Sequence, residues 1–152
     1  MENFFQAESI SNVIQLAVAP VFLLASISGA LNVMSLRLGR IIDRGRRLNE
    51  LPYEQGSPQA IEADNEQRQL ARRARQIHQA ITLSTMSSLF VCLVIVVLFV
   101  DALFQLHLEI FIAVLFIIAL LCLIVGLLIF LKEIRLSTHA FNFGRYKIVD
   151  KP

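Results

Sequence analysis

The sequence has 152 residues, which is enough for one domain, and 56% of them are hydrophobic. Its mean hydropathy of +0.64 is higher than soluble domains usually show. The apolar residues form three long blocks instead of recurring at a helix or strand period, which excludes an ordinary soluble domain. The net charge of +2 hides a strong segregation of charge along the chain.

Three segments are predicted to cross a membrane, at residues 13–34, 80–104 and 108–131. Each supplies the roughly 20 apolar residues that are needed to cross about 30 Å of hydrocarbon. The first segment is not interpreted as a cleaved signal peptide, because Glu2 and Glu8 stand where such a peptide needs basic residues. The chain is therefore predicted to be one integral membrane domain over residues 1–152.

The lysines and arginines predict the orientation of the chain. Nine of the 14 lie in residues 35–79 and five lie in residues 132–152, with none before the first span or between the second and third. Segments rich in Lys and Arg remain in the cytoplasm. The N-terminus is therefore predicted to lie outside, and residues 132–152 are predicted to be a cytoplasmic tail.

The segment between the first two spans, residues 35–79, is predicted to be a helical hairpin that prolongs spans 1 and 2 into the cytoplasm. Apolar residues recur on both arms at helical spacing. Residues 52–58, with two prolines and a glycine, separate the arms. Ser57 followed by Pro58 is typical of a helix N-terminus. The predicted fold class is all-α, with three transmembrane helices and this cytoplasmic hairpin.

The arginines of the hairpin form the strongest candidate interaction site. Arg37, Arg40, Arg44 and Arg47 recur at spacings of three, four and three, which places them on one stripe of a helix. Anionic lipid headgroups are one interpretation of this stripe, and a protein or anion partner is the other. Nucleic acid is not expected, because nearby acids dilute the charge and no aromatic residues are interleaved. The candidate binding residues are Arg37, Arg40, Asp43, Arg44, Arg47, Arg72 and Arg75.

Two pairings are expected within the hairpin. Asp43 is expected to pair with Arg47 on the same helix, or to hold several guanidinium groups where the hairpin packs. At the far tip, the arginines around Arg44 are expected to meet Glu62 and Glu66 of the second arm.

Spans 1 and 2 both carry small and polar residues in their cytoplasmic halves. Small residues let helices approach closely, and hydroxyl and amide groups form hydrogen bonds between them. We expect these residues to pack spans 1 and 2 together, with span 3 facing mostly lipid; a pore lining is the alternative. The candidate packing residues are Ala25, Gly29, Asn32, Ser84 and Ser88.

The first span and the hairpin share a motif with a known family. The resemblance rests on Leu31-Asn32, Arg37-x-x-Arg40-x-x-Asp43-Arg44 and Arg47-Leu48, which follow an apolar start at Ala17-Val-Ala-Pro20. This pattern resembles a family of small three-span bacterial membrane proteins known only as a domain of unknown function. The resemblance implies a bacterial inner membrane and three spans. It implies no activity, cofactor or catalytic residue.

No group of residues suited to catalysis or metal binding stands out. The sequence lacks a paired histidine and nucleophile, a glycine-rich phosphate loop and a metal-binding pattern. Asp101, His107 and Glu109 near the outer turn are interpreted as interfacial polar residues and not as a cation site. The predicted function is that of a non-enzymatic protein, without metal or cofactor, which assembles with itself or another membrane protein through the basic hairpin. The alternative is a subunit of a homo-oligomeric ion channel or transporter.

Overall fold

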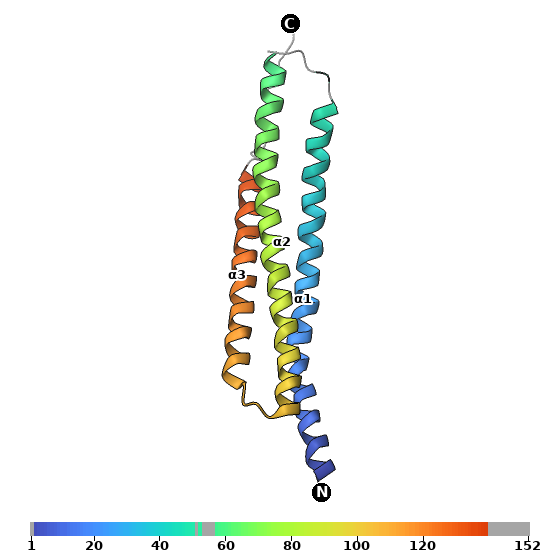
Figure 1. Ribbon diagram of the computed structural model, residues 1–152. Coiled ribbons are helices and arrows are strands. Elements are labelled where there is room, and N and C mark those ends of the chain that lie inside the picture. The colour runs from blue at the N-terminus through green and yellow to red at the C-terminus, as the bar shows by residue number, and fades with distance from the viewer. Residues whose placement is uncertain (1, 51, 53–56, 140–152) are drawn as a thin grey trace.

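The computed structural model describes residues 2–50, 52 and 57–139, and within these ranges it describes side chains from residue 14 to residue 135. This part of the chain forms three helices and no strand: α1 (Glu2–Glu50), α2 (Pro58–Phe104) and α3 (Glu109–His139). Each helix is long and apolar enough to cross a membrane. The prediction of an all-α protein with three such helices is confirmed (Figure 1).

The hairpin is helical on both arms, as predicted. α1 continues without interruption to Glu50, and α2 begins at Pro58. The Ser57 side chain accepts a hydrogen bond from the backbone N–H of Ala60 at 3.2 Å, so it caps the first turn of α2. The 47 residues of α2 extend over about 70 Å, more than twice the thickness of the hydrocarbon core. Much of α2 and its partner arm in α1 therefore projects beyond a bilayer, and we call this projecting part the hairpin end.

Asp101 organises the turn between α2 and α3. Its backbone carbonyl accepts a hydrogen bond at 2.7 Å from Gln105, which ends α2 in a left-handed conformation with φ of 50°. Its carboxylate accepts a second hydrogen bond, at 3.0 Å, from the N–H of Leu108 just before α3.

Among the described residues no group of three or more acidic, histidine or cysteine side chains could hold a metal ion.

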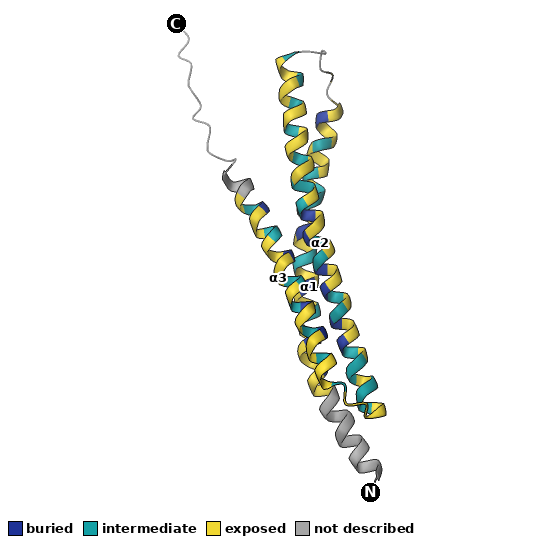
Figure 2. Cartoon of the chain, turned by 60° about the vertical axis from the view of Figure 1, so that its left-hand side comes forward, coloured by how far each residue is buried: buried dark blue, intermediate teal, exposed yellow. Residues whose placement is uncertain are grey.

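A narrow seam of buried residues joins the three helices, and it appears as dark patches along their inner sides in Figure 2. The buried residues of α2 alternate at spacings of three and four, the pattern of helices that pack nearly parallel to one another. They are Ile77, Ala80, Ser84, Ser87, Val91 and Val94. In each apolar window only 17% of the residues are buried inside the chain. Because so much apolar surface is left uncovered, these segments of the helices are suited to a lipid environment.

Two of the small polar residues of span 2, Ser84 and Ser87, lie against α3. Ser87 donates a buried hydrogen bond of 2.7 Å to the carbonyl of Ala119 on α3. Gly126 lies against Ser84: a Cβ added there would be 3.1 Å from the Ser84 Oγ and 3.2 Å from the Ala80 carbonyl oxygen. The missing side chain of Gly126 is what lets α3 approach so closely.

The contact between α1 and α2 is apolar instead. Its centre is a buried cluster of Met34, Ile77 and Ala80, against which α3 also packs through Ile129 and Phe130. The three helices thus meet at one level, next to the start of the hairpin. Most of the large apolar residues on the outer side of α3 are exposed, in keeping with the expectation that this helix faces mostly lipid.

α3 is longer than the sequence predicted. It continues past the expected end of the span at residue 131 and reaches His139, so the first part of the predicted tail is helical. Residues 140–152 of that tail lie outside the described residues. The extra helical length keeps Glu133 on the same face as Gly126, seven residues earlier, and turns it toward the other helices.

Candidate functional site

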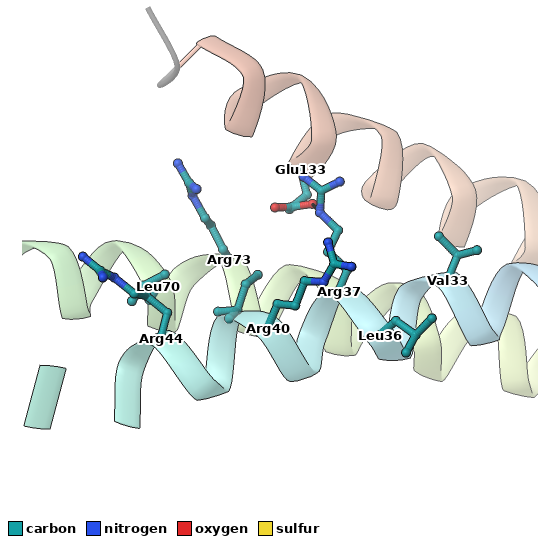
Figure 3. A pocket seen from close by; sticks show the side chains of 9 residues that line it. Val33, Leu36, Arg37, Arg40, Arg44, Leu70, Arg73 and Glu133 are labelled. Atoms are coloured by element: carbon teal, nitrogen blue, oxygen red, sulfur yellow. Dashed lines mark ion pairs between the residues drawn. The ribbon is translucent and has the colours of Figure 1, made fainter. Parts of the chain in front are cut away.

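A buried ion pair links α3 to α1 at the base of the hairpin end. The side chain of Glu133 is only 1% exposed, and its Oε2 lies 2.9 Å from the Nε of Arg37, whose side chain is 31% exposed. Figure 3 shows Glu133 reaching from α3 toward Arg37 on α1. A carboxylate removed from water is stable only beside an opposite charge, so Arg37 is the group that makes the position of Glu133 tolerable.

This ion pair leaves Glu133 with unused capacity to accept hydrogen bonds. Neither of its carboxylate oxygens accepts one from any described group. Buried polar atoms without a hydrogen-bond partner are rare in native proteins and call for an explanation. Glu133 also lines a groove between the three helices, while its carboxylate oxygens themselves are covered by the surrounding residues.

The groove lies where α3 diverges from the hairpin, a divergence that is plain in Figure 2. Its volume is about 610 Å³, within the range of small-molecule sites. All three helices contribute to its lining. The lining residues are Val33, Leu36, Arg37, Arg40, Ile41, Arg44, Leu70, Arg73 and Glu133.

Four arginines and one glutamate make the groove strongly cationic. Arg37 is engaged by Glu133, and Arg44 is engaged by Glu66. Arg40 on α1 and Arg73 on α2 form no ion pair within the described part of the chain. Figure 3 shows both side chains extending from the groove walls. The groove can therefore accommodate an anion between two helices.

The expected contact at the hairpin tip is confirmed for Arg44. Its Nε lies 2.9 Å from the Oε1 of Glu66, and its Nη2 lies 3.3 Å from the Oε2. Both side chains are about half exposed, so this two-point contact contributes less than about 1 kcal/mol. Arg47 and Glu62 border a second groove of about 260 Å³ beside this pair, but no ion pair joins them in the described residues.

The expected pairing of Asp43 is not found. Asp43 is exposed on α1 and forms no ion pair with any described residue. It lies on the side of α1 that faces away from α2 and α3, so its carboxylate points away from both helices. Arg72 and Arg75 are also exposed on α2, and neither lines the large groove.

The candidate packing residues divide into two groups. Ser84 is buried, and Ser88 is half-buried with its hydroxyl donating to the carbonyl of Ser84 at 3.2 Å. Ala25, Gly29 and Asn32 are all exposed, and a Cβ added at Gly29 would meet nothing within 4 Å. These three residues of α1 are therefore left uncovered by the described part of their own chain.

Sequence reasoning missed Glu133 and Gly126. Both occupy the inner face of α3, seven residues apart, which is two helical turns. One signal was available: Glu133 is a lone acid between Lys132 and Arg135, two residues after an apolar run. A charge at that place is costly unless it is paired, which points to an arginine on another helix.

One comparison with known proteins gives a match. The family model described as "Protein of unknown function (DUF2721)" matches residues 17–143, which is most of the chain. No curated protein and no solved structure matches this chain. The matched range includes all three apolar segments and both arms of the hairpin.

Proposed function

We propose that this chain, which belongs to the DUF2721 family, is a non-enzymatic membrane protein that assembles with a second copy of itself through one face of α1. The observation that carries the proposal is the exposure of Ala25, Gly29 and Asn32 within a helix that crosses the membrane. We call these three residues the α1 face.

The α1 face has the properties of a helix contact without a partner. Its residues follow at spacings of four and three, so they share one side of α1, opposite the buried Ile27 and Met34. A side-chain amide facing lipid is costly, and contact with another helix removes that cost. The open space at Gly29 allows a second backbone to come close.

Symmetry favours a second copy of the chain as that partner. Two copies inserted in the same orientation place identical residues at identical depths, so Gly29 meets Gly29 and Asn32 meets Asn32 across a two-fold axis. The amide of Asn32 both donates and accepts hydrogen bonds, and is therefore complementary to itself.

Asp43 supports the same arrangement outside the membrane. It follows the α1 face at helical spacing, eleven residues after Asn32, and so lies on the same side of α1. Because it has no ion pair among the described residues, its carboxylate is available to an exposed arginine of a second copy, such as Arg47. The pairing expected within one helix is then proposed between two chains.

The hydroxyl groups of α2 favour assembly over a pore. The channel alternative needs the serines of spans 1 and 2 to face a central axis. Ser84 and Ser87 are instead buried, and the latter donates to α3. Thr82 and Thr85 donate to backbone carbonyls of their own helix four residues earlier. Ser87, Thr82 and Thr85 therefore donate within one chain, and Ser84 is buried against Gly126, so none of the four supports a pore lining.

We also propose a bacterial inner membrane, with the N-terminus outside and the hairpin end in the cytoplasm, where anionic headgroups lie against its arginines. The support is the distribution of all 14 basic residues at the hairpin end and in the tail.

A thiol reagent that does not cross membranes should label Gln105→Cys, in the turn between α2 and α3, in intact cells, whereas Gln59→Cys, near the hairpin tip, should react only after lysis. The reverse labelling would contradict the orientation. Both tests need Cys92 and Cys122 replaced by serine.

Replacing Gly29 by Leu should weaken self-association in a bilayer at least about tenfold, because the added side chain holds the two backbones apart. Energy transfer between two labelled populations of the chain in liposomes, measured over a range of protein-to-lipid ratios, gives the dissociation constant. The matched control is Ala113→Leu, which adds the same bulk to an exposed position on α3.

Association that is equal in the two variants would contradict the proposal. A wild-type chain that remains a monomer at every ratio would also contradict it, and would direct attention to a different membrane protein as the partner. Unaltered helix content in both variants, measured by circular dichroism, separates lost association from lost folding.

A further inference from the structure

The large groove at the hairpin end combines two chemistries in one place. Val33 and Leu36 lie at the side nearest the membrane-crossing segment, and they are 56% and 62% exposed. The arginines begin with Arg37 and follow toward the hairpin tip. A molecule that fills this groove meets apolar side chains first and cations about one to two helical turns further on.

The cations of the groove are placed to hold a phosphate. Arg40 projects from α1 and Arg73 from α2, and neither is bound by a carboxylate of the described chain. Arg37 and Arg44 stand on the same wall, each with its own acidic partner, and complete a cationic rim. Guanidinium groups are well suited to phosphate oxygens, because their N–H groups form parallel hydrogen bonds with them.

Glu133 adds a requirement for a hydrogen-bond donor. Its carboxylate is buried at the α3 side of the groove, and neither oxygen accepts a hydrogen bond from a described group. A bare inorganic phosphate would be repelled by this negative charge. A headgroup that carries hydroxyl groups beyond its phosphate would satisfy it.

We propose that the groove binds one anionic phospholipid whose headgroup carries hydroxyl groups, as in phosphatidylglycerol. The phosphate lies between Arg40 and Arg73, and an acyl chain passes along Val33 and Leu36 into the bilayer. The Glu133 side chain, which is covered in the unliganded chain, turns toward the groove and accepts hydrogen bonds from the headgroup hydroxyls. The volume of about 610 Å³ accommodates a headgroup with its glycerol backbone. The site lies on all three helices and does not involve the α1 face, so it goes beyond the proposed self-assembly.

The test is the binding of defined lipids to the full-length, delipidated chain in detergent, followed by native mass spectrometry. The lipids are phosphatidylglycerol, phosphatidylmethanol and phosphatidylcholine of one chain length, and inorganic phosphate is the lipid-free arm. Phosphatidylglycerol should bind most tightly. Phosphatidylmethanol has the same charge without the hydroxyl groups, and phosphatidylcholine is neutral overall, so both should bind more weakly.

The variant Arg40→Gln/Arg73→Gln should weaken phosphatidylglycerol binding about tenfold or more, because both contacts to the phosphate are lost. The control is Arg46→Gln/Arg72→Gln, which removes the same charge from the same two helices at exposed residues that do not line the groove. The control should bind phosphatidylglycerol as the wild type does.

Equal losses in the two double variants would overturn the proposal, because binding would then follow total charge and not the groove. Equal binding of phosphatidylglycerol and phosphatidylcholine would overturn it too, and so would inorganic phosphate that displaces the lipid at matching concentration. Equal binding of phosphatidylglycerol and phosphatidylmethanol would overturn the role given to Glu133. Matched helix content in the two double variants, measured by circular dichroism, shows that both are folded.

Discussion

Replacing Arg37 by Gln is expected to lower the free energy of unfolding by about 3–5 kcal/mol, the usual result of leaving a buried charge without its partner. Glu133 is 1% exposed, and Arg37 is the cation beside it. The matched control is Arg44→Gln, which breaks an ion pair of the same 2.9 Å length on the same helix, but between half-exposed side chains. The control should cost less than about 1 kcal/mol.

The pair itself is expected to be replaceable. In the double variant Arg37→Leu/Glu133→Leu the two charges disappear together, and apolar side chains of similar volume fill the space, so stability should return close to that of the wild type. The purified chain is unfolded by a denaturing detergent and followed by circular dichroism. This measurement gives the difference in free energy of unfolding between the wild type and each of the three variants. A loss in Arg37→Gln no larger than that in Arg44→Gln would contradict the role assigned to the buried pair.

Replacing Gly126 by Leu is the second change with a large expected effect, because it forces α3 away from α2. Even a Cβ at this position would lie 3.2 Å from the backbone oxygen of Ala80, and backbone cannot yield as a flexible side chain can. Overpacking of this kind costs about 1–3 kcal/mol or more. Displacement of α3 would also break the hydrogen bond from Ser87 to Ala119.

Gly29→Leu provides the comparison for Gly126→Leu, since it is the same substitution at a glycine whose Cβ would meet nothing within 4 Å. At high detergent-to-protein ratio, where chains are separated, Gly29→Leu should unfold as the wild type does, whereas Gly126→Leu should unfold at a lower denaturant concentration. Gly126→Ala should lie between the two. Similar stability of the two leucine variants would contradict the close α2–α3 contact.

The sequence allowed the hairpin to be predicted because its signals are local. Ser57 and Pro58 mark the start of a helix by their own backbone chemistry, whatever the rest of the chain does. The Arg44–Glu66 contact follows from the hairpin, because its two arms lie side by side and bring opposite charges to the same height.

The packing of α3 could not be predicted in the same way. A helix that is apolar on every side gives no hydrophobic periodicity from which to read the face that packs. The face is determined by the absence of a side chain at Gly126 and by one acid beyond the apolar run, and both act only through residues on other helices. Ser84 and Ser87 of span 2 lie against this face of α3.

The candidate site was predicted in part. The arginine stripe identified Arg37 and Arg40, because their spacing places them on one side of α1. Arg73 and Glu133 join them from α2 and α3, and that meeting depends on where α3 diverges from the hairpin. No spacing along the chain encodes that point of divergence.

Self-assembly through the α1 face is the central claim, and cross-linking in native membranes tests it most directly. In a chain with Cys92 and Cys122 replaced by serine, Ala25→Cys should give a disulfide-linked dimer on mild oxidation. Ile117→Cys, at a 56% exposed position on α3, should remain monomeric under the same conditions. Dimers from Ile117→Cys and none from Ala25→Cys would contradict self-assembly through the α1 face.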